Sequence, residues 1–194
     1  MKGHRFMSEF KINQNTSINS KYLDECIFRI SENDLSYMNE LYDLTQVCIY
    51  SYALSILKNK YDAEDVTHDC YVTVFNSAHQ YKSNGKPLAW LITITRNLAL
   101  AKLNEKKRYV DKDISEYQIA DEKDLSDIDR ITLDTCLNWL NDEERQVVVL
   151  HAISGFKHRE IAKILDMSLS GVLSKYNRAI KKLKTRYEKG MKNE

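Results

Sequence analysis

The sequence predicts an all-α protein made of two small helical domains joined by an acidic, flexible linker. Only 5 Gly and 1 Pro occur among 194 residues, which leaves few turn residues for a β-sandwich or a barrel. Hydrophobic residues make up 43% of the chain and recur at helical spacing, so amphipathic helices can cover a core. A run of acidic residues in the middle of the chain interrupts this pattern and divides the helices into two groups.

Opposed charge blocks underlie a formal net charge of only +1. Residues 82–110 carry 7 basic and 1 acidic side chains, residues 111–144 carry 3 and 12, and residues 157–194 carry 11 and 4. Two basic blocks separated by an acidic block indicate that a polyanion binds at two places.

Several functional classes lack support in the sequence. No apolar stretch reaches the ~18–20 residues of a membrane helix, and no apolar signal core follows Met1, so we expect no membrane insertion and a cytoplasmic location. Cys26, Cys48, Cys70 and Cys136 form no pair at zinc-ligand spacing, so we expect reduced thiols and no metal site. Because P-loop, GxSxG and HExxH motifs are missing, we expect no catalytic residues, no cofactor and no enzymatic activity.

The first domain is expected to follow a disordered tail over residues 1–20 and to span residues 21–108. Asp62 fits the N-cap of its third helix, and Pro87 fits the first turn of its fourth. The helices of this domain are expected over residues 22–30, 41–57, 63–77 and 87–107.

The third helix presents an acidic face away from its apolar side. The face follows the spacing i, i+3, i+4, i+7, i+11 and consists of Asp65, His68, Asp69, Val72 and Asn76. Two carboxylates beside an apolar side chain suit a basic partner helix. The alternatives are a metal site, for which no other helix supplies a matching set of ligands, and a plain solvated face.

The fourth helix carries a polar-to-basic stripe opposite its apolar side. The stripe consists of Thr93, Arg96, Asn97, Leu100, Asn104 and Lys107. Its basic side chains can neutralise phosphates, and Asn97 can hydrogen-bond a base edge or a sugar. Trp90 could stack on DNA, although packing within the domain is the favoured interpretation.

The second domain is expected over residues 127–188, after a linker at 109–126 and before a tail at 189–194. Residues 141–144 (NDEE) resemble a capping box, and Ser154-Gly155 ends the helix that follows. A short helix over 158–165, a turn at 166–168 and a basic helix from about Ser170 past Lys184 then describe a helix-turn-helix. The second helix of this motif enters the DNA major groove, so DNA binding is favoured over a helical hairpin with a solvated lysine face.

With these motifs in view, the chain resembles an RNA polymerase sigma factor of the sigma-70 family, of the small two-domain extracytoplasmic-function (ECF) type. Residues 62–75 (DAEDVTHDCYVTVF) are similar to the acidic core-binding helix of region 2.2, and residues 87–100 (PLAWLITITRNLAL) to the −10 recognition helix. Residues 140–147 are similar to the opening of region 4, and residues 156–165 to the start of its helix-turn-helix.

The resemblance implies a non-enzymatic subunit that docks on the β′ clamp coiled coil and the β flap of core RNA polymerase. It would direct the polymerase to promoters through double- and single-stranded DNA, and an anti-sigma factor would be a further partner. The acidic face of the third helix would then bind core polymerase. The −10 element would be bound by Asn84, Lys86, Thr93, Arg96, Asn97 and Lys107. The −35 element would be bound by Ser174, Lys175, Asn177 and Arg178, with Arg159, Lys181 and Lys182 on phosphates.

The recognition helix departs from the family pattern at three positions that bear on −35 specificity. Leu173 stands where many members carry Lys or Arg, and it could contact a thymine methyl group. Gly171 stands where Thr often caps the helix, so Ser168 or Ser170 must cap it. Asp166 replaces a common turn Gly and tolerates the left-handed conformation.

The alternative function is a helix-turn-helix transcriptional regulator that acts without binding polymerase core. Such a regulator should be a dimer that reads a palindrome, whereas a sigma factor alone should be a monomer.

Overall fold

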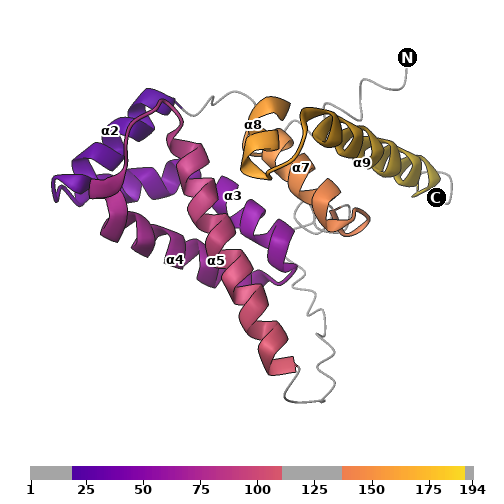
Figure 1. The fold of residues 1–194 in the computed structure, drawn as a ribbon, viewed down its shortest axis with the longest axis horizontal. Helices are drawn as coiled ribbons and strands as arrows, with labels where there is room; N and C mark the ends of the chain where they lie inside the picture. Colours follow the sequence, from indigo (N-terminus) through magenta and orange to yellow (C-terminus); the bar gives the residue numbers. More distant parts are fainter. Residues whose placement is uncertain (1–18, 111–136, 191–194) are drawn as a thin grey trace.

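All regular structure in the computed structural model is helical, across the residues it describes, 19–110 and 137–190 (Figure 1). The first domain consists of α2 (Ser20–Ser31), α3 (Ser36–Leu57), α4 (Lys60–Ser77), the short 3-10 helix η1 (Ala78–Gln80) and α5 (Pro87–Val110). The second consists of α7 (Asp142–Ala152), α8 (His158–Ile164) and α9 (Leu169–Gly190). The predicted all-α architecture is confirmed.

The core of the first domain forms around α3, against which α2, α4 and α5 pack. Tyr52, the largest of the fully buried side chains, lies on α3 with Leu41 and Ile49, all 0% exposed. The buried hydroxyl of Thr45 is satisfied locally: it donates to the Leu41 carbonyl and lies 2.8 Å from the Tyr71 hydroxyl.

Two helix starts in this domain differ from the sequence prediction. The prediction of Asp62 as an N-cap is wrong, because α4 begins at Lys60 and the Asn59 side chain accepts a 3.0 Å hydrogen bond from the Asp62 N–H. Asn59 therefore satisfies the end of the helix, and Asp62 lies within the first turn. Helix α3 begins at Ser36, earlier than expected, and the Asp34 carboxylate accepts from both the N–H and the hydroxyl of Ser36.

The second domain contains the expected helix-turn-helix, formed by α8 and α9 and supported by α7. The capping box is confirmed: Glu144 N–H donates to the Asn141 side chain, and Asn141 N–H donates to the Glu144 carboxylate. Asp166 takes the expected left-handed conformation, with φ 54°. The cap of α9 is Ser168, whose hydroxyl accepts from the Gly171 N–H at 3.1 Å.

Other predictions fall on residues outside the described ones. These are most of the tail predicted over 1–20, of the linker predicted over 109–126 and of the tail predicted over 189–194, and the second domain up to 136. The edges of these predictions are wrong where the structure describes them, because α2 begins at Ser20, α5 runs to Val110 and α9 runs to Gly190. Across the helices that the structure does describe, none combines the length and the apolar character needed to cross a membrane.

Candidate nucleic-acid and partner-binding surfaces

The acidic face of α4 is exposed as predicted. Asp65, His68, Asp69, Val72 and Asn76 are all exposed, whereas the opposite residues Val66, Cys70 and Val74 are buried in the core. Sequence reasoning missed Phe75, which is 47% exposed beside Val72, itself 46% exposed. Two adjacent exposed apolar side chains among carboxylates give this face an apolar centre with a charged rim. The sequence does hold a sign that Phe75 shares this face, because it lies three residues after Val72 on the same helix.

Two lysines of α5 reach the acidic residues of α4. Lys102 Nζ lies 2.6 Å from Asp65 Oδ2 and 3.7 Å from Asp62 Oδ1, and Lys106 forms an ion pair with Asp62. The hydrogen bond and charge of Lys102 lower the pKa of Asp65. This cluster, the α4–α5 ion pairs, keeps Lys102 and Lys106 on the side of α5 opposite Thr93 and Asn97.

The predicted −10 residues lie on α5 and in the turn before it. Thr93, Asn97 and Lys107 are exposed along one side of the helix. Burial raises the pKa of the Tyr52 hydroxyl, and the charge of the half-buried Arg96 nearby opposes this rise. The effect of burial is the larger one, so the pKa of the Tyr52 hydroxyl is raised overall. Arg96 therefore lies at the margin of the stripe, with its guanidinium near the core.

The turn over residues 82–86 is exposed, and hydrogen bonds fix its conformation. The Asn84 side chain accepts from the Lys86 N–H at 3.1 Å, as in an Asx turn. Lys86 Nζ lies 3.0 Å from Glu160 Oε1 on α8. Nearby, Trp90 packs against Tyr81 with ring centroids 4.8 Å apart, so the expected packing of Trp90 within the domain is confirmed.

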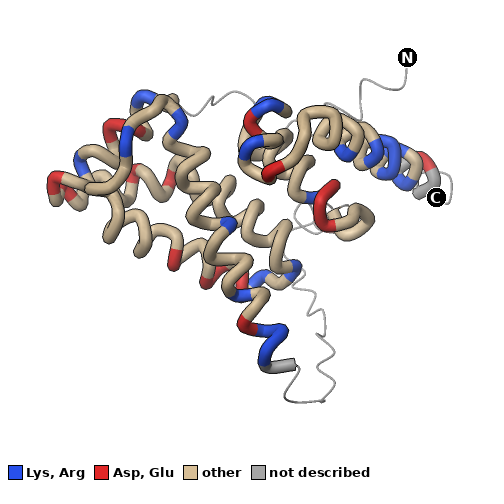
Figure 2. Tube along the Cα trace, in the orientation of Figure 1, with Lys and Arg blue, Asp and Glu red and all other residues tan. Residues whose placement is uncertain are grey.

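The exposed side of α9 carries most of the predicted −35 residues. Ser174, Asn177, Arg178 and Lys181 follow the spacing i, i+3, i+4, i+7 and are all exposed. Leu173 flanks them and is 41% exposed. Figure 2 shows Lys and Arg residues along the length of α9. Arg159 is exposed on α8. This surface suits contact with phosphates and base edges.

Lys175 and Lys182 lie toward α7 and pair with its carboxylates. Lys175 Nζ lies 2.5 Å from Glu143 Oε2, and Lys182 Nζ lies 2.7 Å from Glu144 Oε2. The Glu144 side chain is only 2% exposed, and burial alone would raise its pKa. The Lys182 ammonium and the Asn141 N–H outweigh burial, so the pKa of Glu144 is lowered. Both lysines therefore contribute to the packing of α9 on α7.

Three rings gather between the helices of the second domain. His151 stacks on His158 with centroids 4.4 Å apart, and Tyr176 meets both rings edge-on at 4.9 Å. Burial, and then the neighbouring His151, lower the pKa of His158. Tyr176 is thus half-buried and packs against the core of the domain, on the side that its place in the apolar stripe predicted.

These features define a two-domain helical protein with a helix-turn-helix in its second domain. Comparison with known proteins gives its family: a family model for Sigma-70 region 2 matches residues 41–109, and one for Sigma-70 region 4 matches residues 130–183. Together they span more than half of the chain, which belongs to the sigma-70 family of RNA polymerase sigma factors. Sigma factors initiate transcription and are not enzymes, in agreement with the sequence prediction.

Curated relatives indicate the ECF type. The ECF RNA polymerase sigma factor SigK of Mycobacterium tuberculosis is 25% identical over 175 residues, which cover 85% of this chain and 93% of SigK. SigK of Mycobacterium sp. (strain KMS) is 27% identical over 174 residues, which cover 84% of this chain and 89% of the relative.

Two solved structures share the fold. CnrH in complex with the cytosolic domain of CnrY is 20% identical, with a TM-score of 0.60, covering 85% of this chain and 96% of that chain. The sigma factor RpoE from Bartonella quintana in complex with the anti-sigma factor NepR is 22% identical, with a TM-score of 0.61, covering 77% and 97%.

Proposed function

We propose that this ECF sigma factor divides its work between three exposed surfaces. The face of α4 binds core RNA polymerase, the stripe of α5 with the preceding turn binds the −10 element, and the exposed side of α9 binds the −35 element. The observation that carries the proposal is the presence, in one chain, of an acidic, partly apolar face on α4 and a basic recognition helix on α9. A helix-turn-helix regulator that acts alone has no need of the first.

The α4 face suits a basic coiled coil, and we assign to it the β′ clamp. Asp69 supplies an exposed carboxylate, and Val72 and Phe75 supply apolar surface that water would leave on binding. The second domain is assigned to the β flap from the family resemblance. Because its proposed partner is core RNA polymerase, we assign the protein to the cytoplasm.

DNA recognition follows from the two basic surfaces. Arg178 and Lys181 supply positive charge for phosphates, while Ser174 and Asn177 supply hydrogen-bonding groups for base edges. On α5, Thr93 and Asn97 are exposed polar groups in the N-terminal half of the stripe, and Lys107 adds charge at its C-terminal end. Asn84 lies in the turn that precedes the helix and suits a base taken out of the stack.

An anti-sigma factor is a further proposed partner. The structures of CnrH and of RpoE, whose folds this chain shares, were solved with CnrY and with the anti-sigma factor NepR, respectively. This parallel supports regulation by a protein that binds one or both domains.

Run-off transcription with purified core polymerase tests the proposal, on a pool of promoter fragments from the organism's own genome. We expect discrete new transcripts that depend on the protein. Asp69→Ala should abolish them, whereas Glu40→Ala, which removes an exposed carboxylate of α3, should leave them unchanged. If no transcript forms, and the protein shifts duplex DNA as a dimer without binding core polymerase, the regulator hypothesis replaces this one.

A further inference from the structure

The turn over residues 82–86 connects η1 to α5, and helix α2 packs on both of these elements (Figure 1). Its own conformation is set locally: the Asn84 side chain accepts from the Lys86 N–H at 3.1 Å, and Gly85 takes the left-handed conformation with φ 71°. Such contacts give the turn its shape, but they do not orient it relative to the helices. An anchor outside the turn is therefore needed to hold Asn84 in one place.

That anchor is Tyr81, the residue immediately before the turn. Its hydroxyl donates to Asp24 Oδ1 on α2 at 2.5 Å, and its ring packs on Trp90 of α5 with centroids 4.8 Å apart. Burial raises the pKa of the Tyr81 hydroxyl, and the hydrogen bond and charge of Asp24 raise it further. Tyr81 therefore stays protonated at neutral pH and remains the donor to Asp24.

The carboxylate of Asp24 is not what holds α2 in place. Across the part of the chain that the structure describes, its bond to Tyr81 is the one side-chain hydrogen bond that joins α2 to another element. The helix is held to the core by four buried apolar side chains, which are Leu23, Cys26, Ile27 and Ile30. Loss of the carboxylate should therefore leave α2 packed and release the start of the turn.

We propose that Asp24 is a positioning residue for the −10 element: by holding the Tyr81 hydroxyl, it fixes the turn in which Asn84 meets a base taken out of the stack. This inference rests on the proposed function, which assigns that base to the turn. Because Asn84 Oδ1 already accepts from the Lys86 N–H, the amide nitrogen of Asn84 is left to donate to the base. A shift of about 1 Å takes a hydrogen bond of about 2.9 Å beyond its effective range, so the position of this donor matters.

The effect on the turn is measured first, in the free protein. Lys82 is exposed, and trypsin cleaves after it only when the turn leaves its fixed conformation. Asp24→Ala should accelerate this cleavage about fivefold, as followed by mass spectrometry. Asp24→Asn, whose amide oxygen can still accept from Tyr81, should stay within about twofold of wild type. The matched control is Glu25→Ala, which removes an exposed carboxylate whose partner, Arg29, lies on α2 itself.

The effect on DNA is measured by fluorescence anisotropy with holoenzyme, assembled from core polymerase and the protein. Two probes come from a promoter found by run-off transcription: the single-stranded non-template −10 segment and the −35 duplex. Asp24→Ala should weaken binding of the first probe about tenfold and leave the second within about twofold. Tyr81→Phe keeps the ring and removes the hydroxyl, so it should have the same effect. The double variant should be no weaker, because both substitutions remove one bond.

An abasic scan separates positioning from a general structural defect. Each base of the single-stranded probe is removed in turn, and the wild type should lose about tenfold in affinity at the captured position. Asp24→Ala should lose almost nothing further at that position and respond like the wild type at the others. An unstable protein would instead lose affinity equally for every probe, and circular dichroism in urea measures its stability directly.

Each outcome decides between the claims. Wild-type affinity of Asp24→Ala for the −10 probe, equal loss for both probes, or additive losses at every abasic position would overturn the role of Asp24 and leave the sigma-factor function standing. Unchanged cleavage after Lys82 in Asp24→Ala would overturn the anchoring of the turn. Accelerated cleavage, together with a wild-type holoenzyme that does not bind the −10 probe, would refute the proposed function and leave only the anchoring.

Discussion

Lys182 was predicted from sequence to contact DNA, yet its ammonium compensates a buried carboxylate, so Lys182→Met should destabilise the second domain. Removing one partner of a fully buried ion pair costs about 3–5 kcal/mol. Here the Glu144 side chain is 2% exposed and the Lys182 side chain 46% exposed, so water reaches one side of the pair. The Asn141 N–H continues to donate to Glu144 at 3.2 Å. We therefore expect a loss of about 2 kcal/mol, which is below that range.

Urea unfolding of the full chain measures this loss. Trp139 lies in the second domain and Trp90 in the first, so a Trp90→Phe background leaves fluorescence from Trp139 alone. With a slope of about 1 kcal/mol per M, the midpoint in Lys182→Met should fall by about 2 M. The control is Lys181→Met, which removes an exposed lysine and should shift the midpoint by less than about 0.5 M.

The pH dependence separates this pair from general packing. Because the pKa of Glu144 is lowered in the folded protein, its stabilising contribution is present above 4.5 and is lost as pH falls below that value. Lys182→Met removes much of this contribution, so the midpoints of variant and wild type should converge in acid. Equal midpoints for the two lysine variants at pH 7, or a difference that persists at pH 3, would refute the reasoning.

Three further predictions concern other parts of the chain. Burial and His151 lower the pKa of His158, so the unfolded chain binds that proton more readily and the second domain should lose stability as pH falls below 6.5. His158→Gln should flatten the change in urea midpoint between pH 7.5 and 5.5, and an equally steep change would contradict this assignment. Phe75→Ala should weaken binding to core polymerase about tenfold in an anisotropy titration, with unfolding almost unchanged because the ring is 47% exposed; a matching loss of stability would instead make Phe75 structural. Asn59→Ala should destabilise the first domain by about 1 kcal/mol, read from Trp90 fluorescence in urea, and a silent substitution would argue against Asn59 as the N-cap.

The features predicted best from sequence are those determined by a few neighbouring residues. The capping box at Asn141 and the left-handed Asp166 depend on short-range geometry that the residue types specify. The same reasoning assigned the cap of α4 to Asp62, because it weighed one good capping residue and overlooked Asn59, an equally good one three residues earlier. Residue preferences for the N-cap therefore do not decide between two suitable residues that lie close together in the sequence.

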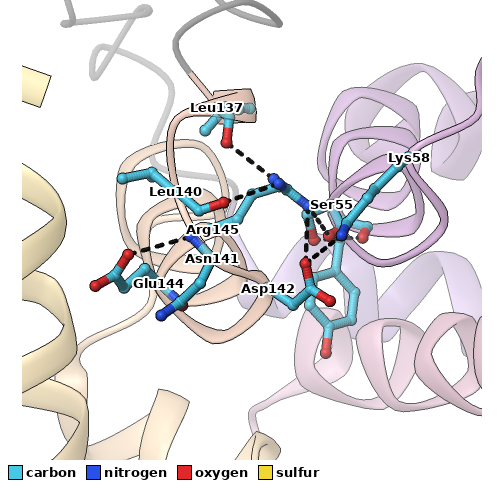
Figure 3. A network of polar contacts seen from close by, with 9 residues as sticks. Ser55, Lys58, Leu137, Leu140, Asn141, Asp142, Glu144 and Arg145 are labelled. Atoms are coloured by element: carbon cyan, nitrogen blue, oxygen red, sulfur yellow. Dashed lines mark hydrogen bonds and ion pairs between the residues drawn. The ribbon is translucent and has the colours of Figure 1, made fainter. Parts of the chain in front are cut away.

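Contacts between distant elements were beyond sequence reasoning. Nothing in the spacing of charges assigns Lys102 to Asp65, which precedes it by 37 residues, or Lys182 to Glu144. A helical wheel gives the face on which a lysine lies, but only the packing of helices determines which carboxylate it meets. The contact between the two domains is of the same kind, since the sequence does not show that Arg145 of α7 donates to the Ser55 carbonyl of α3 (Figure 3).

The α4–α5 ion pairs have a consequence for how this protein can vary among its relatives. They join a helix assigned to polymerase with a helix assigned to the promoter, so a substitution selected on one side alters the charge balance of the other. Positions 62 and 65 should therefore change together with positions 102 and 106 over evolution. Substitutions that exchange the charges of both partners of an ion pair should be tolerated at these positions. A substitution that changes the charge of only one partner should be removed by selection.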